Sequence, residues 1–142
     1  MIDRKVPMNM LITVAALAVA GFTSYAFTKA GIDKLKTSDA DLLARGWGWV
    51  SKAPKGTTKF IGLAELLGGL GVILSPVAVT VFNFDWALPL GIAAAAGLAT
   101  IMVLANLVHI VRKEFKYTYK SGLMLLAVTV IATVLLAYYP TA

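Results

Sequence analysis

Of the 142 residues, 59% are hydrophobic and only 14% are charged, whereas soluble domains have about 45–50% and about 25%. A soluble domain of this size must expose much of its surface to water and could not bury such an apolar excess, so the composition indicates an integral membrane protein. The chain has no cysteine, which excludes disulfides, thiolate metal sites, iron–sulfur clusters and thiol redox catalysis by its own residues.

The first apolar segment has no charge between Lys5 and Lys29 and predicts a transmembrane helix over 8–34. About twenty apolar residues are enough to cross about 30 Å of hydrocarbon at 1.5 Å per residue. The alternative is a cleaved signal peptide, because residues 18–20 resemble a small-residue cleavage site. The apolar run continues past residue 20, which favours the helix.

A polar and mixed connection follows over 29–59. Residues 39–45 predict a short helix lying on the membrane surface. Trp47 and Trp49 stand next to Gly46 and Gly48, and tryptophan between two membrane segments is typical of an anchor at the membrane–water interface. Pro54 then interrupts the chain before the next apolar run.

Three further apolar runs predict helices over 57–76, 86–111 and 120–139, with Pro76 ending the second and 77–85 connecting it to the third. Open sheets would leave unpaired backbone groups in lipid, so strands are poor alternatives. The predicted fold class is therefore all-α. We expect a polytopic membrane protein with one membrane domain over 1–142, a left-handed bundle of four transmembrane helices and a short interfacial helix in the first loop.

The net charge of +6 predicts an orientation rather than a nucleic-acid partner, because the basic residues lie between the apolar runs. With four crossings, the loops 29–59 and 112–120 lie on one side and hold seven and four Lys or Arg, against two before the first helix. The positive-inside rule then places these loops in the cytoplasm and both termini outside it. The predicted location is the inner (plasma) membrane.

The carboxyl group of Glu65 lies within the second apolar run. An ionisable group there costs on the order of 2.5–3.5 kcal/mol by insertion scales, so it requires a partner or a function. Gly62, Gly68 and Gly69 stand at i−3, i+3 and i+4 on the same helical face. Glycines allow another backbone to approach closely, so we expect Glu65 to face protein and not lipid.

Four other polar residues fall in the same half of the membrane as Glu65 under this topology: Lys29, Lys34, Asn106 and His109. This polar cluster is the candidate ligand-binding or proton-handling site. The alternatives are a structural ion pair of Glu65 with Lys34 or Lys29, an inert protonated Glu65, and a His109 that is simply solvated. One histidine without cysteine cannot build a zinc site or bis-histidine haem ligation within this chain, so no metal site is expected.

Three short patterns carry a family resemblance. They are Gly-x-x-Glu-Leu-x-Gly at Gly62, Glu65, Leu66 and Gly68, Gly-x-x-Lys-Leu at Gly31, Lys34 and Leu35, and Ala-x-x-x-His at Ala105 and His109. In this order they resemble the DoxX-like family of small four-helix membrane proteins. The resemblance implies a four-helix bundle tied to membrane redox systems, since members occur as subunits of quinone-linked sulfur oxidation and as accessory proteins in the maturation of periplasmic enzymes.

The leading hypothesis is a non-catalytic accessory or scaffold component of a membrane redox, quinone-linked or envelope-maturation system, which holds partner subunits or a quinone-like molecule against the polar cluster. The alternative is a small proton- or cation-coupled transporter or channel subunit that uses Glu65. An enzyme with Glu65 and His109 as acid and base is least favoured, because no nucleophile, metal site or cofactor motif accompanies them. Expected partners are the lipid bilayer and protein subunits of a complex or a homo-oligomer.

Overall fold

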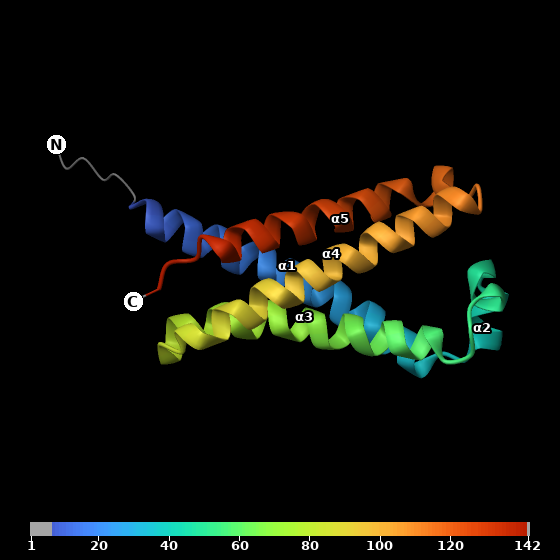
Figure 1. The fold of residues 1–142 in the computed structure, drawn as a ribbon, viewed down its shortest axis with the longest axis horizontal. Helices are drawn as coiled ribbons and strands as arrows, with labels where there is room; N and C mark the ends of the chain where they lie inside the picture. Colours follow the sequence, from blue (N-terminus) through green and yellow to red (C-terminus); the bar gives the residue numbers. More distant parts are fainter. Residues whose placement is uncertain (1–6, 142) are drawn as a thin grey trace.

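The computed structural model describes residues 7–141, and within them every regular secondary-structure element is a helix. Arg4 and Lys5, the two basic residues before the first helix, lie outside the described residues. The long helices are α1 (Met8–Lys36), α3 (Thr57–Phe82), α4 (Leu88–Val111) and α5 (Phe115–Ala137), and the short ones are α2 (Asp39–Ala44), η1 (Gly48–Lys52) and η2 (Asp85–Ala87) (Figure 1). The all-α prediction is confirmed for this part of the chain, and four helices are long and apolar enough to cross a membrane.

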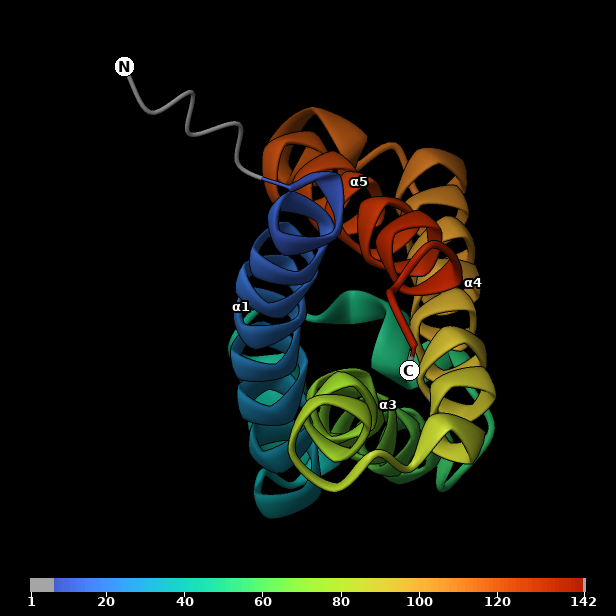
Figure 2. The same ribbon diagram turned by 90° about the vertical axis from the view of Figure 1, so that its left-hand side faces the viewer.

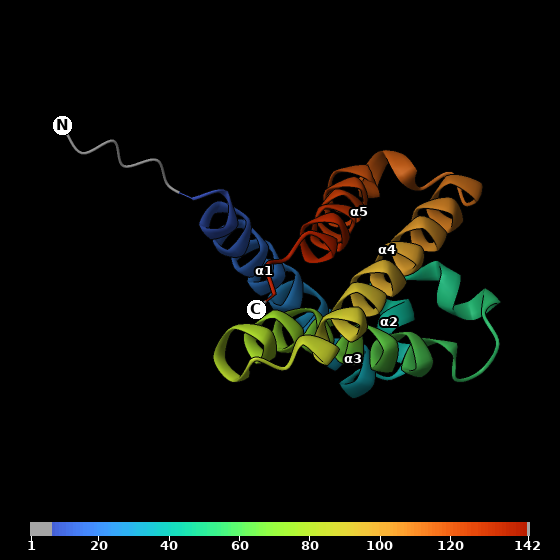
Figure 3. The ribbon, with the colours of Figure 1, turned by 60° about the vertical axis from the view of Figure 1, so that its left-hand side comes forward.

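The four long helices lie around a ring in the order α1, α3, α4, α5 when the molecule is viewed from one end (Figure 2). The pairs α1/α3 and α4/α5 have the most extensive contacts, and α1 and α5 touch least. Towards the end that carries α2, the α4/α5 pair separates from the α1/α3 pair, as Figures 1 and 3 show. The segment with α2 and η1 lies at this widened end of the bundle.

The core is built from small residues and a few large apolar side chains. Ala16, Ala20, Ala95 and Ala132 are almost fully buried and allow the helices to approach, while larger side chains fill the spaces between them: Phe27, Val72, Leu98 and Leu136. The outer faces carry many exposed large apolar residues, including Phe60, Leu67 and Leu74 on α3. Such faces are costly in water and suit a hydrocarbon solvent.

The predicted end of the second apolar helix at Pro76 is wrong, because α3 continues to Phe82. A proline removes one backbone donor, yet the apolar run continues beyond it and a membrane helix keeps every other backbone bond within itself. The helix ends instead at Asn83, whose φ of 56° is left-handed and typical of a helix C-terminus. The predicted connection 77–85 therefore shrinks to a short segment around η2.

Other boundaries moved for local reasons. The last helix begins at Phe115 and not near residue 120, because Lys113 adopts a φ of 60° and makes a tight turn directly after α4. Trp86, expected to open the third helix, lies in η2, and α4 starts at Leu88. The short helix expected over 39–45 is present as α2, where Ser38 accepts a hydrogen bond from the Asp41 backbone N–H at 3.1 Å.

Candidate functional site

Two glycines bring α1 and α3 into backbone contact. A Cβ added to Gly31 would lie 2.5 Å from the carbonyl oxygen of Gly62 and 2.7 Å from the backbone nitrogen of Leu66, so no side chain fits there. A Cβ on Gly62 would lie 2.9 Å from Cβ of Lys34. This close crossing places the side chain of Lys34 beside α3.

The other two glycines near Glu65 face different helices. Gly69 packs on α1, where an added Cβ would lie 2.8 Å from Oγ1 of Thr28. Gly68 instead faces α4, and an added Cβ would lie 2.7 Å from a methyl group of Leu98. An added Cβ on Gly69 would also lie 3.0 Å from the backbone nitrogen of Thr28. The expectation that the glycines admit a neighbouring backbone is therefore confirmed for Gly62 and Gly69 and wrong for Gly68, which makes room for a leucine side chain.

A buried ion pair joins the two helices just beyond the glycine crossing. The Lys34 ammonium donates to Oε2 of Glu65 at 2.7 Å, and the two side chains are only 11% and 7% exposed. Lys34 Nζ also lies 5.3 Å from the centre of the Trp47 ring, which covers it from the η1 side. Glu65 thus faces protein, as expected, and its charge is balanced by a lysine from the neighbouring helix.

Lys59 makes polar contacts that were not predicted from the sequence. Its ammonium donates to the carbonyl oxygens of Lys34 at 2.8 Å, Leu35 at 3.3 Å and Thr37 at 2.5 Å. These carbonyls lie at the end of α1, where backbone acceptors have no partner within the helix and the helix dipole attracts a cation. Its position in the first turn of the second apolar helix, opposite the end of the first, was the available signal.

Asn106 lies apart from the ion pair, at the contact of α4 with α5. Its side-chain amide donates to the Met102 carbonyl at 2.8 Å and to the Gly122 carbonyl at 3.2 Å. Oδ1 of Asn106 is buried without a hydrogen-bond partner among the described residues and lies against Gly122, which leaves no room for a side chain. The glycine on α5 therefore allows this asparagine to tie two helices together.

His109 lies at the end of α4 and contacts the following turn. Its Nδ1 is 3.3 Å from Oε2 of Glu114, whose Oε1 accepts from Nε of Arg112 at 2.9 Å. Partial desolvation raises the pKa of Glu114, but the hydrogen bonds from His109 and Arg112 outweigh it and hold that pKa below its ordinary value of 4.5. The basic residues Arg112 and Lys113 lie in this turn, yet the direct contact of His109 is the acid Glu114.

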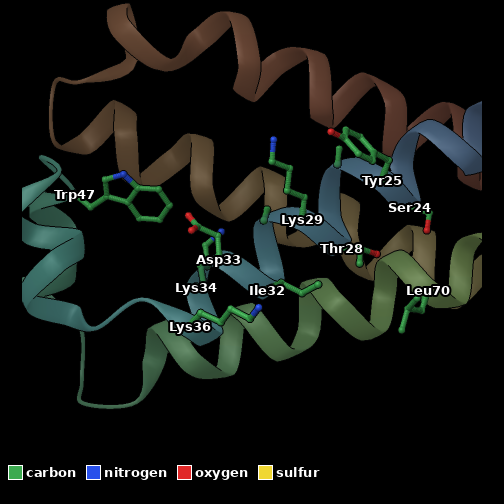
Figure 4. Close-up of a pocket in the computed structure, with 12 residues that line it drawn as sticks. Ser24, Tyr25, Thr28, Lys29, Ile32, Asp33, Lys34, Lys36, Trp47 and Leu70 are labelled. Atoms are coloured by element: carbon green, nitrogen blue, oxygen red, sulfur yellow. The ribbon is translucent and has the colours of Figure 1, made fainter.

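Lys29 belongs to a groove that runs along the outer side of α1, which we call the α1 groove. Its volume is about 860 Å³, and it is lined by Tyr25, Lys29, Ile32, Lys36, Trp47 and Leu70 among others (Figure 4). Lys29 Nζ lies 5.9 Å from the centre of the Tyr25 ring. Within the described residues, direct contacts therefore join only Lys34 and Glu65 of the five cluster residues, and the other three lie at separate places.

Comparison with protein families matches residues 13–137 to the DoxX-like family. The matched range contains all three patterns that carry the resemblance, including Lys34, Glu65 and His109. No curated protein and no solved structure matches the chain.

Proposed function

The chain belongs to the DoxX-like family, and on this premise we propose that it is a non-catalytic accessory or scaffold component of a membrane system. The system is linked to quinone redox chemistry or to the maturation of envelope proteins. In this role the helices hold partner subunits or a quinone-like molecule within the membrane.

The observation that carries the proposal is that four of the five residues of the polar cluster are bonded within the chain, namely Lys34, Glu65, Asn106 and His109. Glu65 accepts from Lys34, Asn106 donates to the backbone of α5, and His109 contacts Glu114. Acid–base catalysis requires both groups to reach one substrate. Among residues 7–141 no contact joins Glu65 to His109, and each of these four bonded groups fixes a helix or a turn, which supports a structural role.

We further propose that the protein crosses the inner membrane with both termini outside the cytoplasm. The 29–59 and 112–120 segments, which hold eleven of the 13 basic residues, lie at the widened end of the bundle together with α2 (Figure 1). This supports the proposal that the widened end faces the cytoplasm and that α2 lies at the membrane surface there. At the α3–α4 connection, Phe82, Phe84 and Trp86 stack at 5.7 Å between successive ring centres and are exposed. Aromatic residues in such positions are typical of the opposite membrane–water interface.

The scaffold proposal is tested in membranes of the native cell. We expect deletion of the gene to lower either quinone-linked dye reduction by membrane vesicles or the active fraction of periplasmic enzymes. The wild-type chain and the Lys34→Met/Glu65→Leu double variant should both restore it, because a scaffold needs the helices to pack and not the charges themselves. A double variant that reaches the membrane in normal amounts but restores nothing would refute a non-catalytic role, and a deletion without effect would refute the redox and maturation link.

A proton- or cation-coupled transporter that uses Glu65 is the second candidate. It is favoured by one observation, a carboxylate buried within a helix that is apolar enough to span a membrane. Proton flux into liposomes distinguishes the two proposals. The scaffold proposal predicts equal leakage for the wild type and for Glu65→Gln, whereas a lower flux in the variant would favour transport.

A further inference from the structure

The α1 groove combines two lysines with an apolar length of helix. Tyr25, Lys29, Ile32 and Lys36 follow one another at i, i+4, i+7 and i+11 and therefore share one face of α1. Figure 4 shows Lys29 and Tyr25 projecting on the same side of the helix, with Trp47 at one end of the groove. Three small residues of α1 also line the groove, and α3 contributes Leu70. The small residues are Ser24, Ala26 and Ala30.

The charges around this groove leave a local excess of two positive charges. The acid in its wall, Asp33, pairs with Arg45 at 3.3 Å, and Lys34 pairs with Glu65. Neither Lys29 nor Lys36 takes part in an ion pair between residues of the described part of the chain. An anionic group bound between these two lysines would balance the excess.

Lys29 is also placed inside the apolar helix rather than at its end. It lies seven residues before the last residue of α1, about 10 Å along the axis. Its ammonium lies over the Tyr25 ring, one turn further from that end. A lysine near the end of a membrane helix normally extends towards the headgroups, and a charge turned the other way requires a counter-ion.

From these observations we propose that the α1 groove binds one anionic phospholipid. On binding, the Lys29 side chain turns from the Tyr25 ring towards Lys36, so that both ammonium groups contact the phosphate. Trp47 lies beside the headgroup, and an acyl chain runs along α1 past Tyr25 against Leu70. A volume of about 860 Å³ is within the range of ligand pockets. A quinone ring is neutral and would leave both lysines unbalanced, so the charge favours the phospholipid. This proposal is independent of the proposed function.

The test uses Trp47 as the reporter. The chain has 3 tryptophans, so a Trp49→Phe/Trp86→Phe background leaves Trp47 alone. This protein is reconstituted into phosphatidylcholine vesicles that contain an equal, minor fraction of either dibrominated phosphatidylglycerol or dibrominated phosphatidylcholine. Bromine quenches nearby indole fluorescence, so we expect stronger quenching by the brominated phosphatidylglycerol. Each lysine near the membrane surface should strengthen the association with the anionic lipid about fivefold.

The Lys29→Gln/Lys36→Gln variant should remove the difference between the two brominated lipids. The matched control is Lys116→Gln/Lys120→Gln, which removes two charges from α5 and should leave the difference unchanged. The Lys29→Arg/Lys36→Arg variant keeps the charge and should retain it. Equal quenching of the reporter by the two lipids, or an equal loss in the control variant, would overturn the proposal. In the reporter protein with both lysines intact, added unbrominated phosphatidylglycerol should compete with the brominated lipid and restore the fluorescence of Trp47. Restoration by a long-chain quinone and not by phosphatidylglycerol would also overturn the proposal.

Discussion

Removing one partner of the Lys34–Glu65 pair should destabilise the protein far more than replacing both. The pair is 2.7 Å apart with 11% and 7% of its side chains exposed, so water and salt screen it little. Breaking a buried ion pair leaves an uncompensated charge and typically costs about 3–5 kcal/mol. We therefore expect a loss of about that size in the free energy of unfolding for Lys34→Met and for Glu65→Leu alone.

The double variant Lys34→Met/Glu65→Leu should lie within about 1 kcal/mol of the wild type, because apolar residues of similar volume replace both charges and avoid their desolvation. The two single losses then total at least about 6 kcal/mol, so the coupling energy of this cycle should be at least about 5 kcal/mol. The same protein supplies a control in Asp33 and Arg45, which are 3.3 Å apart but 48% and 53% exposed. Exposed pairs contribute about 0–1 kcal/mol, so the cycle on this pair should give a small coupling.

Both cycles can be measured by reversible unfolding in mixed micelles titrated with sodium dodecyl sulfate, followed by far-UV circular dichroism. Each single variant is compared with the wild type and with its double variant under identical detergent composition. A coupling for Lys34 and Glu65 no larger than that for Asp33 and Arg45 would refute the account of the α1–α3 crossing.

Three further predictions concern the free energy of unfolding. Gly31→Ala should lower it by about 1–3 kcal/mol, because the new Cβ would lie 2.5 Å from a backbone oxygen of α3, whereas Gly21→Ala, with nothing within 4 Å, should be neutral or stabilising in the same titration. Lys59→Met should cost about 1.5–3 kcal/mol by removing a charged donor from the end of α1, and faster amide hydrogen exchange in the last turn of α1 would report it. The lowered pKa of Glu114 contributes stability that is present above its ordinary value of 4.5 and is lost as the pH falls through the lower value of the folded state. Unfolding titrations at several pH values should show a smaller acid-dependent loss for Glu114→Gln than for the wild type, and identical slopes would contradict this.

The sequence was sufficient to predict the four transmembrane helices, the partner of Glu65 and the close packing at the glycines. Four apolar runs of sufficient length have few alternatives to transmembrane helices, because backbone groups in lipid must bond within their own segment. The partner of Glu65 could be anticipated as a lysine at the end of the first helix, since few charges exist at that depth. Glycine spacing likewise indicated close packing, although it could not tell which of the two neighbouring helices each glycine would face.

The features that could not be predicted from the sequence depend on local backbone geometry, or on which neighbouring helix or turn a polar side chain contacts. The passage of α3 through Pro76 depends on a balance between one missing hydrogen bond and the cost of opening a helix in lipid. Asn106 and His109 were grouped with Glu65 by depth alone, but depth does not give the direction of a side chain around the ring of helices. The tight turn at Lys113 brought Glu114 to His109, and a positive φ at a lysine has no sequence signal.

The contacts between helices indicate which neighbouring pairs are held together most strongly. The α1/α3 contact combines a glycine crossing with an ion pair, and the α4/α5 contact has Asn106 bonded to Gly122. Ser75 of α3 donates to the carbonyl of Ala87 at 2.8 Å, at the end of η2 directly before α4. The contact of α1 with α5 is the least extensive, and no side-chain hydrogen bond joins these two helices within residues 7–141. In a membrane, where apolar packing alone gives little preference for protein over lipid, polar contacts of this kind decide which helices stay together. A partner helix that inserted between α1 and α5 would therefore break fewer contacts than one inserted between any other neighbouring pair of helices. The Lys34–Glu65 ion pair would still hold α1 to α3 after such an insertion.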